Sequence, residues 1–178
     1  MQKNVSNMHY HVQDTVLYGQ SGVCRIADIA EKDVGGGLRA YYVLQPVFEE
    51  SATIFVPVGN EALTAKMRRV MSEAEITALI DAMPEEDSIW IADDNARRER
   101  YKAILAGGDP SDLIRLIKTL YLRAQTQKAQ NKKPRLEDER FMKQAEKLLY
   151  EEFAHVLHIQ RDEVLPYILH RVNGSTPS

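Results

Sequence analysis

The chain has one cysteine, Cys24, and one tryptophan, Trp90, among its 178 residues. A lone cysteine leaves no intramolecular disulfide framework, so a reducing cytoplasm is the simplest compartment. No uninterrupted run of about 18 apolar residues is present, so we expect no membrane span. The N-terminal sequence MQKNVSNMHYHV also lacks the apolar core of a secretory signal. We therefore expect a cytoplasmic protein without a membrane partner.

Clusters of chemically reactive side chains are scarce. His155 and His158 stand three residues apart on a predicted helix, but no third ligand has suitable spacing beside them. Cys24 lies in a strand-like pattern without a histidine partner, so we expect it to pack in a core. The sequence thus predicts no catalytic residues, no metal, no cofactor and no small-molecule substrate. It favours a binding protein over an enzyme.

Charge is unevenly distributed along the chain. The formal net charge is −3, which argues against a protein that coats nucleic acid. Residues 97–135, however, hold eleven Lys and Arg against three Asp and Glu, a local net charge of +8. A basic segment in an otherwise acidic chain is a candidate surface for phosphate groups. The alternative is a solvated helix face without a ligand, and composition alone leaves both open.

Residues 12–58 have the pattern of strands. β-Branched and aromatic residues fill the segments DTVLYG, GVCRIADIAEKDV, RAYYVLQPV and ATIFVPV. Glycines 35–37 favour a turn, because glycine adopts positive φ without steric cost. A phosphate-binding loop would need a following helix with a Lys-Ser/Thr pair, which is missing. Short strands with no helix between them predict a small, strongly curved sheet or barrel.

After residue 62 the pattern becomes helical. Ser72 and Glu75 have the spacing of a capping box before an apolar helical stripe, and Pro84 closes that helix. Asp109 and Pro110 mark another helix start. Helices are also predicted over residues 94–105, ended by a glycine pair, and over 136–157. Strands first and helices afterwards predict an α+β chain with two folding units.

The strand segments VQDTVLYGQSGVCRIADI, YYVLQPV and IFVPV resemble the N-terminal domain of the CarD/CdnL family of bacterial transcription regulators. The helical segments RYKAIL, GGDPSDLIRLIKTLYLR and KPRLEDERFMKQAEKLLYEEFAHVL are similar to the C-terminal domain of that family. The resemblance covers roughly residues 10–160. It rests on many spread positions rather than on one diagnostic motif.

The resemblance implies a small Tudor-like β-barrel over residues 8–62, of a type shared with the transcription-repair coupling factor, and an all-α domain over residues 63–172. The β domain is expected to dock on the β subunit of RNA polymerase through an exposed strand edge. The helical domain is expected to contact promoter double-stranded DNA near the upstream edge of the melted bubble. Together these contacts would stabilise the open complex.

The resemblance also implies site residues. Those expected to bind polymerase are Lys32, Thr53, Ile54, Phe55, Val56 and Pro57. Some family members carry arginine where Phe55 stands, so a polar contact is replaced by an apolar one. The alternative for Phe55 is core packing. Residues expected to contact DNA are Trp90, Arg97, Arg98, Arg100, Lys102, Lys132, Lys133 and Lys143, and Arg123 extends this group.

Trp90 has two interpretations. A family tryptophan wedges into the minor groove, but its slot falls at Asp94 or Arg97 by spacing. Ile89 and Ile91 flank Trp90, and this apolar context favours packing. The wedge and the packing residue therefore both stay open.

A second function class competes with the DNA-contacting regulator. The chain would then be an adaptor that binds RNA polymerase or another protein and makes no direct DNA contact. The arrangement of the basic segment discriminates between them. One continuous basic face favours DNA, whereas pairing with acidic residues favours the adaptor.

Overall fold

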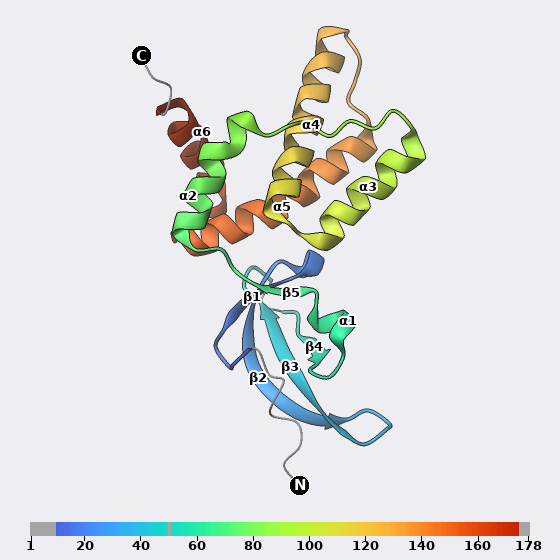
Figure 1. Ribbon diagram of the computed structural model, residues 1–178, viewed down its shortest axis with the longest axis vertical. Coiled ribbons are helices and arrows are strands. Elements are labelled where there is room, and N and C mark those ends of the chain that lie inside the picture. The colour runs from blue at the N-terminus through green and yellow to red at the C-terminus, as the bar shows by residue number, and fades with distance from the viewer. Residues whose placement is uncertain (1–9, 50, 175–178) are drawn as a thin grey trace. The chain divides into compact units, whose positions relative to one another are not determined.

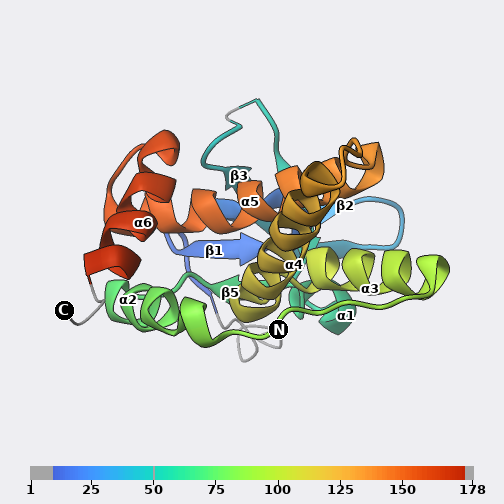
Figure 2. The same cartoon turned by 90° about the horizontal axis from the view of Figure 1, so that it is seen from above.

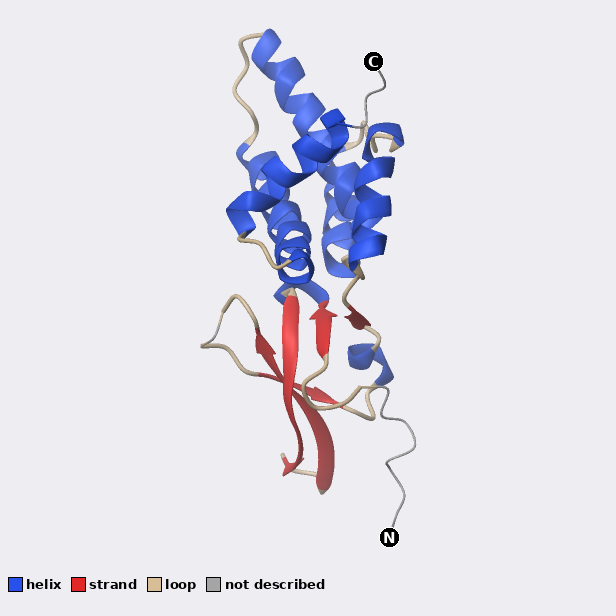
Figure 3. Ribbon diagram, turned by 90° about the vertical axis from the view of Figure 1, so that its left-hand side faces the viewer, coloured by secondary structure: helices blue, strands red, loops and turns tan. Residues whose placement is uncertain are grey.

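The computed structural model describes residues 10–49 and 51–174 and divides into two compact units, one ending at Val70 and the other beginning at Met71. Unit 1 holds all the strands of the described chain, and unit 2 holds its long helices (Figure 3). This arrangement confirms the predicted α+β class with strands before helices.

Unit 1 is one antiparallel sheet with the strand order β4-β3-β2-β1-β5 (Figure 1). The two longest strands, β2 and β3, form a curved hairpin. A short helix, α1 (Glu61–Thr64), precedes the last strand. The strands are β1 (Thr15–Tyr18), β2 (Val23–Asp33), β3 (Leu38–Pro46), β4 (Ile54–Pro57) and β5 (Met67–Arg69).

The core of unit 1 lies on one face of this sheet. Its buried members come from every strand: Val16, Cys24, Ile26, Tyr42, Leu44, Val56 and Met67. Cys24 is fully buried, which confirms its predicted packing role. A β-bulge shifts the β2–β3 register between Ile26 and Asp28. The extra residue breaks the period of two, and this explains why β2 shows no clean alternation in sequence.

The β2–β3 turn is built on an aspartate. Asp33 Oδ1 accepts the backbone N–H groups of Gly35, Gly36 and Gly37 at 2.9–3.3 Å. Gly35 and Gly37 have φ of 92° and 95°, a conformation that disfavours residues with a side chain. The predicted glycine turn is therefore confirmed. These hydrogen bonds, that of Gly35 first, hold the pKa of Asp33 below its ordinary value.

The sheet is open, so the predicted Tudor-like barrel is not confirmed. Its two edge strands, β4 and β5, do not pair with each other. They are only four and three residues long, and α1 interrupts the chain between them. Unit 1 also extends past the expected boundary at residue 62, because β5 pairs with β1 from Val16 to Tyr18.

Unit 2 contains the helices α2 (Glu73–Ala82), α3 (Asp94–Gly107), α4 (Pro110–Ala129), α5 (Leu136–Leu157) and α6 (Val164–Gly174). The long helices α4 and α5 pack on each other, and α2 lies beside α6 (Figure 2). Leu116, Leu149 and Phe153 are among the buried residues at the centre of this unit. Among the described residues, no helix combines the length and the apolar character that crossing a membrane requires.

The helix ends follow the capping signals in the sequence. Ser72 accepts the N–H of Glu75 at 3.1 Å while Glu75 accepts the N–H of Ser72 at 2.7 Å, a complete capping box. Asp109 caps α4 through the N–H of Asp112 at 3.1 Å. Gly108 ends α3 in the left-handed conformation. The predicted boundaries of these helices are therefore confirmed within two residues.

Candidate functional site

The open edge of β4 is the first feature of the candidate site. This strand pairs with β3, from Leu44↔Ile54 to Tyr41↔Pro57, and no strand of the described chain flanks its other side. An edge strand presents unpaired N–H and C=O groups, which an extended partner segment can continue. The expectation of an exposed strand edge at residues 53–57 is therefore met by the geometry of unit 1.

The side chains of this segment point alternately into and out of the sheet. Val56 is fully buried and can offer only backbone groups to a partner, and the partly buried Ile54 packs against the same core. Thr53 and Phe55 are exposed, and Pro57 is half-buried. Phe55 retains 42% of its surface, which shows that the core-packing alternative for this residue was wrong.

Lys32 and Phe55 form one surface feature. The Lys32 ammonium lies 3.8 Å from the centroid of the Phe55 ring. The register places both side chains on one face of the sheet: Phe55 pairs with Val43, and Val43 pairs with Asp28, which lies four residues before Lys32 on β2. Residues separated by four lie on the same face of a strand. The two expected polymerase contacts therefore meet in a cation–π pair beside the open edge.

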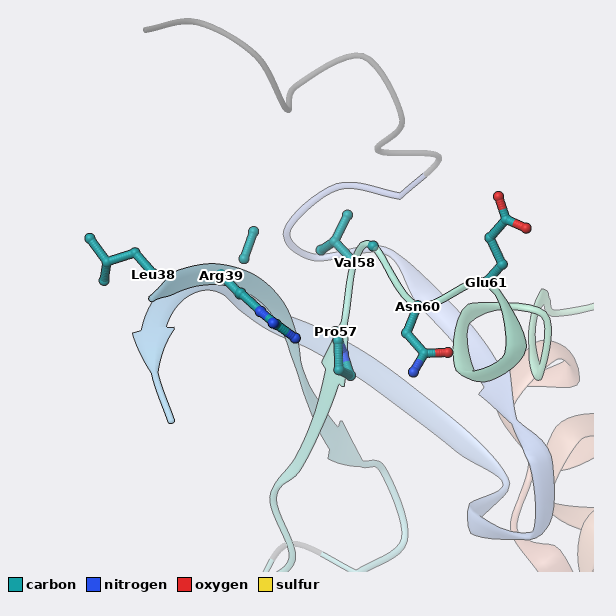
Figure 4. Close-up of a pocket in the computed structure, with 8 residues that line it drawn as sticks. Leu38, Arg39, Pro57, Val58, Asn60 and Glu61 are labelled. Carbon is teal, nitrogen blue, oxygen red and sulfur yellow. The ribbon is translucent and has the colours of Figure 1, made fainter. Parts of the chain in front are cut away.

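A cavity of about 730 Å³ lies where β4 ends (Figure 4). Two chain segments form its walls, because the N–H of Val58 donates to the carbonyl of Ala40 at 3.0 Å. Sequence reasoning missed this cavity, since no single segment carries its pattern. Its lining combines apolar side chains with Arg39, Asn60 and Glu61; the full set is Leu38, Arg39, Ala40, Pro57, Val58, Gly59, Asn60 and Glu61.

In unit 2, Arg97, the first cationic residue of α3, has a structural role. Arg97 is only 5% exposed. It donates to the carbonyls of Ile91 and Ala92 at 2.9 and 3.4 Å and forms an ion pair with Asp94. The hydrogen bond from Arg97 holds the pKa of Asp94 below its ordinary value. Arg97 is therefore not available as a phosphate ligand on the surface.

The other three expected DNA contacts on α3 also have acidic partners. Arg98 pairs with Glu137 of α5 at 2.5 Å. Arg100 lies 3.9 Å from Asp112, and Lys102 lies 3.3 Å from Glu99. The hydrogen bond from Arg98 lowers the pKa of Glu137, which keeps this carboxylate charged. Pairing of the basic residues with carboxylates was expected for an adaptor, and one continuous basic face was expected for a DNA-binding protein. The pairs on α3 therefore favour the adaptor.

A different group of cations is exposed without an acidic partner in the described chain. Lys132 and Lys133 lie in the turn between α4 and α5, and Lys143 lies on α5. A second cavity, of about 430 Å³, opens at this turn. No acidic side chain lines it; the lining residues are Arg123, Thr126, Gln127, Gln130, Lys132, Lys133 and Arg135. The expected basic surface is thus concentrated at the turn rather than on α3.

Trp90 lies under two guanidinium groups. The Cζ atoms of Arg97 and Arg123 are 4.4 and 3.9 Å from the centroid of its ring. The backbone beside it is fixed, because the N–H of Ile89 donates to Thr119 Oγ1 at 2.7 Å. Trp90 is nevertheless 44% exposed. These contacts favour the packing interpretation in the free protein, while the exposed surface leaves the ring within reach of a ligand.

Within residues 10–49 and 51–174, no group of three or more His, Cys, Asp or Glu side chains is arranged to hold a metal ion. Burial, aided by the nearby His158, lowers the pKa of His155. This histidine therefore stays neutral at a lower pH than an exposed one.

The comparisons with known proteins agree with the geometry of unit 1. Residues 10–71 match the family model described as the CarD-like/TRCF RID domain. This range covers all five strands and ends one residue beyond unit 1, and it leaves the helices of unit 2 outside the match. A search of curated proteins found no match to the chain. A CarD-like RNA polymerase-interacting domain points to a transcription-related protein. Unit 1 of this chain therefore belongs to the CarD-like/TRCF RID domain family.

Proposed function

We propose that the protein is a bacterial transcription regulator that docks on the β subunit of RNA polymerase through the edge of β4 and contacts promoter DNA through unit 2. The DNA contact is placed near the upstream edge of the melted bubble, where it stabilises the open complex. The role is non-catalytic. It locates the protein with RNA polymerase at the nucleoid in the bacterial cytoplasm.

The single observation that carries the proposal is the Lys32–Phe55 pair beside the open edge of β4, within the matched domain. Strand addition supplies affinity through backbone hydrogen bonds, and alternate side chains supply specificity. Lys32 offers a positive charge and Phe55 an apolar surface, so the partner segment should combine an acidic side chain with an apolar one. The cavity beyond Pro57 can receive a further side chain of that segment.

The proposed DNA contact is supported by the turn between α4 and α5. Lys132 and Lys133 are exposed there without an acidic partner in the described chain, next to the cavity lined by Arg123 and Arg135. Contacts from such residues to phosphates release counterions and carry no base specificity. The proposal therefore gives the main DNA contact to the turn, with Lys143 and Trp90 as further contacts, and a minor role to Arg98, Arg100 and Lys102.

The adaptor without DNA contact is the second candidate function. The observation that favours it is the pairing of all four expected α3 cations with carboxylates. An adaptor would share the polymerase contact of unit 1 and would be insensitive to substitutions at the α4–α5 turn.

Binding of the full chain to purified RNA polymerase and to its isolated β subunit tests the shared part of both candidates. A fluorescent label on Cys24 is unsuitable because that thiol is buried, so calorimetry or label-free interferometry is preferable. Saturable binding to both targets is expected. Binding to neither would contradict the proposal, and binding to polymerase without binding to β would move the docking site to another subunit.

A further inference from the structure

The cavity at the α4–α5 turn has the chemistry of an anion site. Four of its seven lining residues are cationic and the other three are uncharged hydrogen-bonding residues. Asn131 in the left-handed conformation shapes the turn, and the N–H of Lys132 is fixed to the carbonyl of Gln127 at 2.8 Å. The backbone therefore presents the two lysines at a defined place. Arginine, lysine and glutamine side chains together suit the oxygens of a phosphate group.

Nearby carboxylates do not cancel this charge. Asp138 lies 3.8 Å from Arg123, and Asp94 lies 3.4 Å from Arg135, but neither carboxylate lines the cavity. Glu137 is held by Arg98. Lys132 and Lys133 line the cavity and have no acidic partner among the described residues.

Arg123 links this cavity to Trp90. It lines the cavity, and its Cζ lies 3.9 Å from the centroid of the Trp90 ring. Its other contact is weak, because Asp138 is beyond hydrogen-bonding distance and the buried Nε of Arg123 has no hydrogen-bond partner. A bidentate bond to a phosphate is stronger than a stacking contact or a long ion pair. An anion in the cavity can therefore draw the guanidinium away from the indole.

We propose that the cavity at the α4–α5 turn binds a phosphate group, and that Arg123 couples its occupancy to the environment of Trp90. The phosphate comes either from a duplex backbone or from a free phosphate compound. In the first case the inference rests on the proposed DNA contact and names the phosphate contact of that surface. Occupancy removes one of the two guanidinium groups that lie over the Trp90 ring and leaves that of Arg97 in place.

The first experiment measures binding to the free full-length chain. Inorganic pyrophosphate and a short DNA duplex are titrated separately at constant ionic strength, and the amide NMR shifts of residues 130–133 and 135 are followed. Saturable shifts at the turn are expected. In the double variant Lys132→Ala/Lys133→Ala the affinity should fall about tenfold or more, since each lost charge-assisted bond is worth at least about that factor.

Lys128→Ala is the matched control, because Lys128 is an exposed lysine of α4 that does not line the cavity. Its affinity should stay within about twofold of wild type, as expected for a screened charge outside the site. Saturation by the duplex alone assigns the phosphate to nucleic acid, and saturation by pyrophosphate alone assigns it to a free compound. No saturation by either, or equal weakening in Lys128→Ala, overturns the site.

The second experiment tests the coupling. Trp90 is the one tryptophan of the chain, so intrinsic tryptophan emission reports on it alone. Emission should change with the same midpoint as the NMR shifts. Arg123→Lys keeps the charge but loses the planar guanidinium, so it should still bind pyrophosphate or duplex while its emission response is lost.

An emission that stays constant while the turn saturates overturns the coupling and leaves the site standing. These measurements use no polymerase. Their failure would therefore leave the polymerase contact of unit 1 untouched, and failure of polymerase binding would leave the cavity untouched.

Discussion

The Lys32 ammonium lies 3.8 Å from the centre of the Phe55 ring, although the β2–β3 turn, the whole of β3 and the loop before β4 separate the two residues in sequence. The β2–β3–β4 register places both side chains on the same exposed face of the sheet, and Phe55 lies on the edge strand. The pair needs no partner to form, so its charge and its apolar surface are already positioned when a partner strand arrives. Such preorganisation lowers the ordering cost of binding.

Replacing either member of this pair should weaken polymerase binding. Phe55→Ala removes the apolar contact and leaves Lys32 unsupported, and we expect an affinity loss of about tenfold, typical of a central interface residue. Lys32→Glu should lower the affinity by as much or more, because it reverses the charge that an acidic partner meets. Calorimetry with the isolated β subunit measures both.

Val34→Ala is the control for the Phe55 variant. Val34 is 72% exposed beyond the end of β2 and lies outside β4. Its substitution should change neither the affinity nor the melting temperature appreciably. A Phe55→Ala protein that binds β as tightly as the Val34→Ala protein would remove the Lys32–Phe55 pair from the interface.

The two groups of cations in unit 2 should affect DNA differently. Lys132→Ala/Lys133→Ala should lower duplex affinity and reduce the slope of log K against log salt by about 1 to 2, one for each lost phosphate contact. Arg98→Ala/Arg100→Ala should change the slope less, because these side chains are already paired with Glu137 and Asp112. Binding isotherms at three salt concentrations separate the two variants. If Arg98→Ala/Arg100→Ala reduced the slope more than Lys132→Ala/Lys133→Ala did, the DNA-binding surface would be assigned to α3 instead.

The capping box of α2 should contribute measurably to the stability of unit 2. Ser72→Ala removes the acceptor of the Glu75 N–H, and we expect the free energy of unfolding to fall by about 1 kcal/mol. Ser72→Asp supplies another capping oxygen, so its free energy of unfolding should fall by less than that of Ser72→Ala. Urea unfolding followed by circular dichroism measures both. Equal losses in the two variants would mean that the cap is not the cause.

The Asp81–Arg171 pair predicts a pH dependence. Both hydrogen bonds from Arg171 reach this carboxylate, at 2.7 and 2.8 Å, and they hold the pKa of Asp81 below its ordinary value. A carboxyl group with a lowered folded-state pKa stabilises the fold above its unfolded pKa. That contribution is lost as the pH falls through the lowered value. Arg171→Gln should return the pKa of Asp81 toward its ordinary value in an NMR titration; an unchanged pKa would refute this cause.

The sequence predicted local structure well where one short segment carries the whole signal. The capping box at Ser72, the Asp109–Pro110 start and the Gly108 stop each act within a few residues, and each is found as expected. The glycine turn after Asp33 is of the same kind. Strand number and order were harder, because β5 holds only three residues and is recognisable only through its pairing with β1.

The candidate site depended on contacts that sequence does not encode locally. The basic count over residues 97–135 was correct, but the partners of Arg98 and Arg100 stand outside the α3 segment, at Glu137 and Asp112. The sequence of a helix can predict a basic face although, in the folded protein, carboxylates of another helix pair with its basic side chains. The same limit hid the cavities, whose walls come from separated segments. The role of Trp90 could not be predicted from the sequence, because the residue that lies over its ring, Arg123, is thirty-three residues later in the chain.

The lifetime of an open promoter complex tests the central claim most directly. RNA polymerase and a promoter fragment are mixed with and without the full chain, and the decay of the melted complex is followed after a competitor is added. We predict that the wild-type protein lengthens the lifetime and that Phe55→Ala and Lys132→Ala/Lys133→Ala each remove part of this effect. A lifetime that the wild-type protein leaves unchanged would contradict the account, and a lengthening insensitive to the Lys132 and Lys133 substitutions would replace DNA contact at the α4–α5 turn with the adaptor.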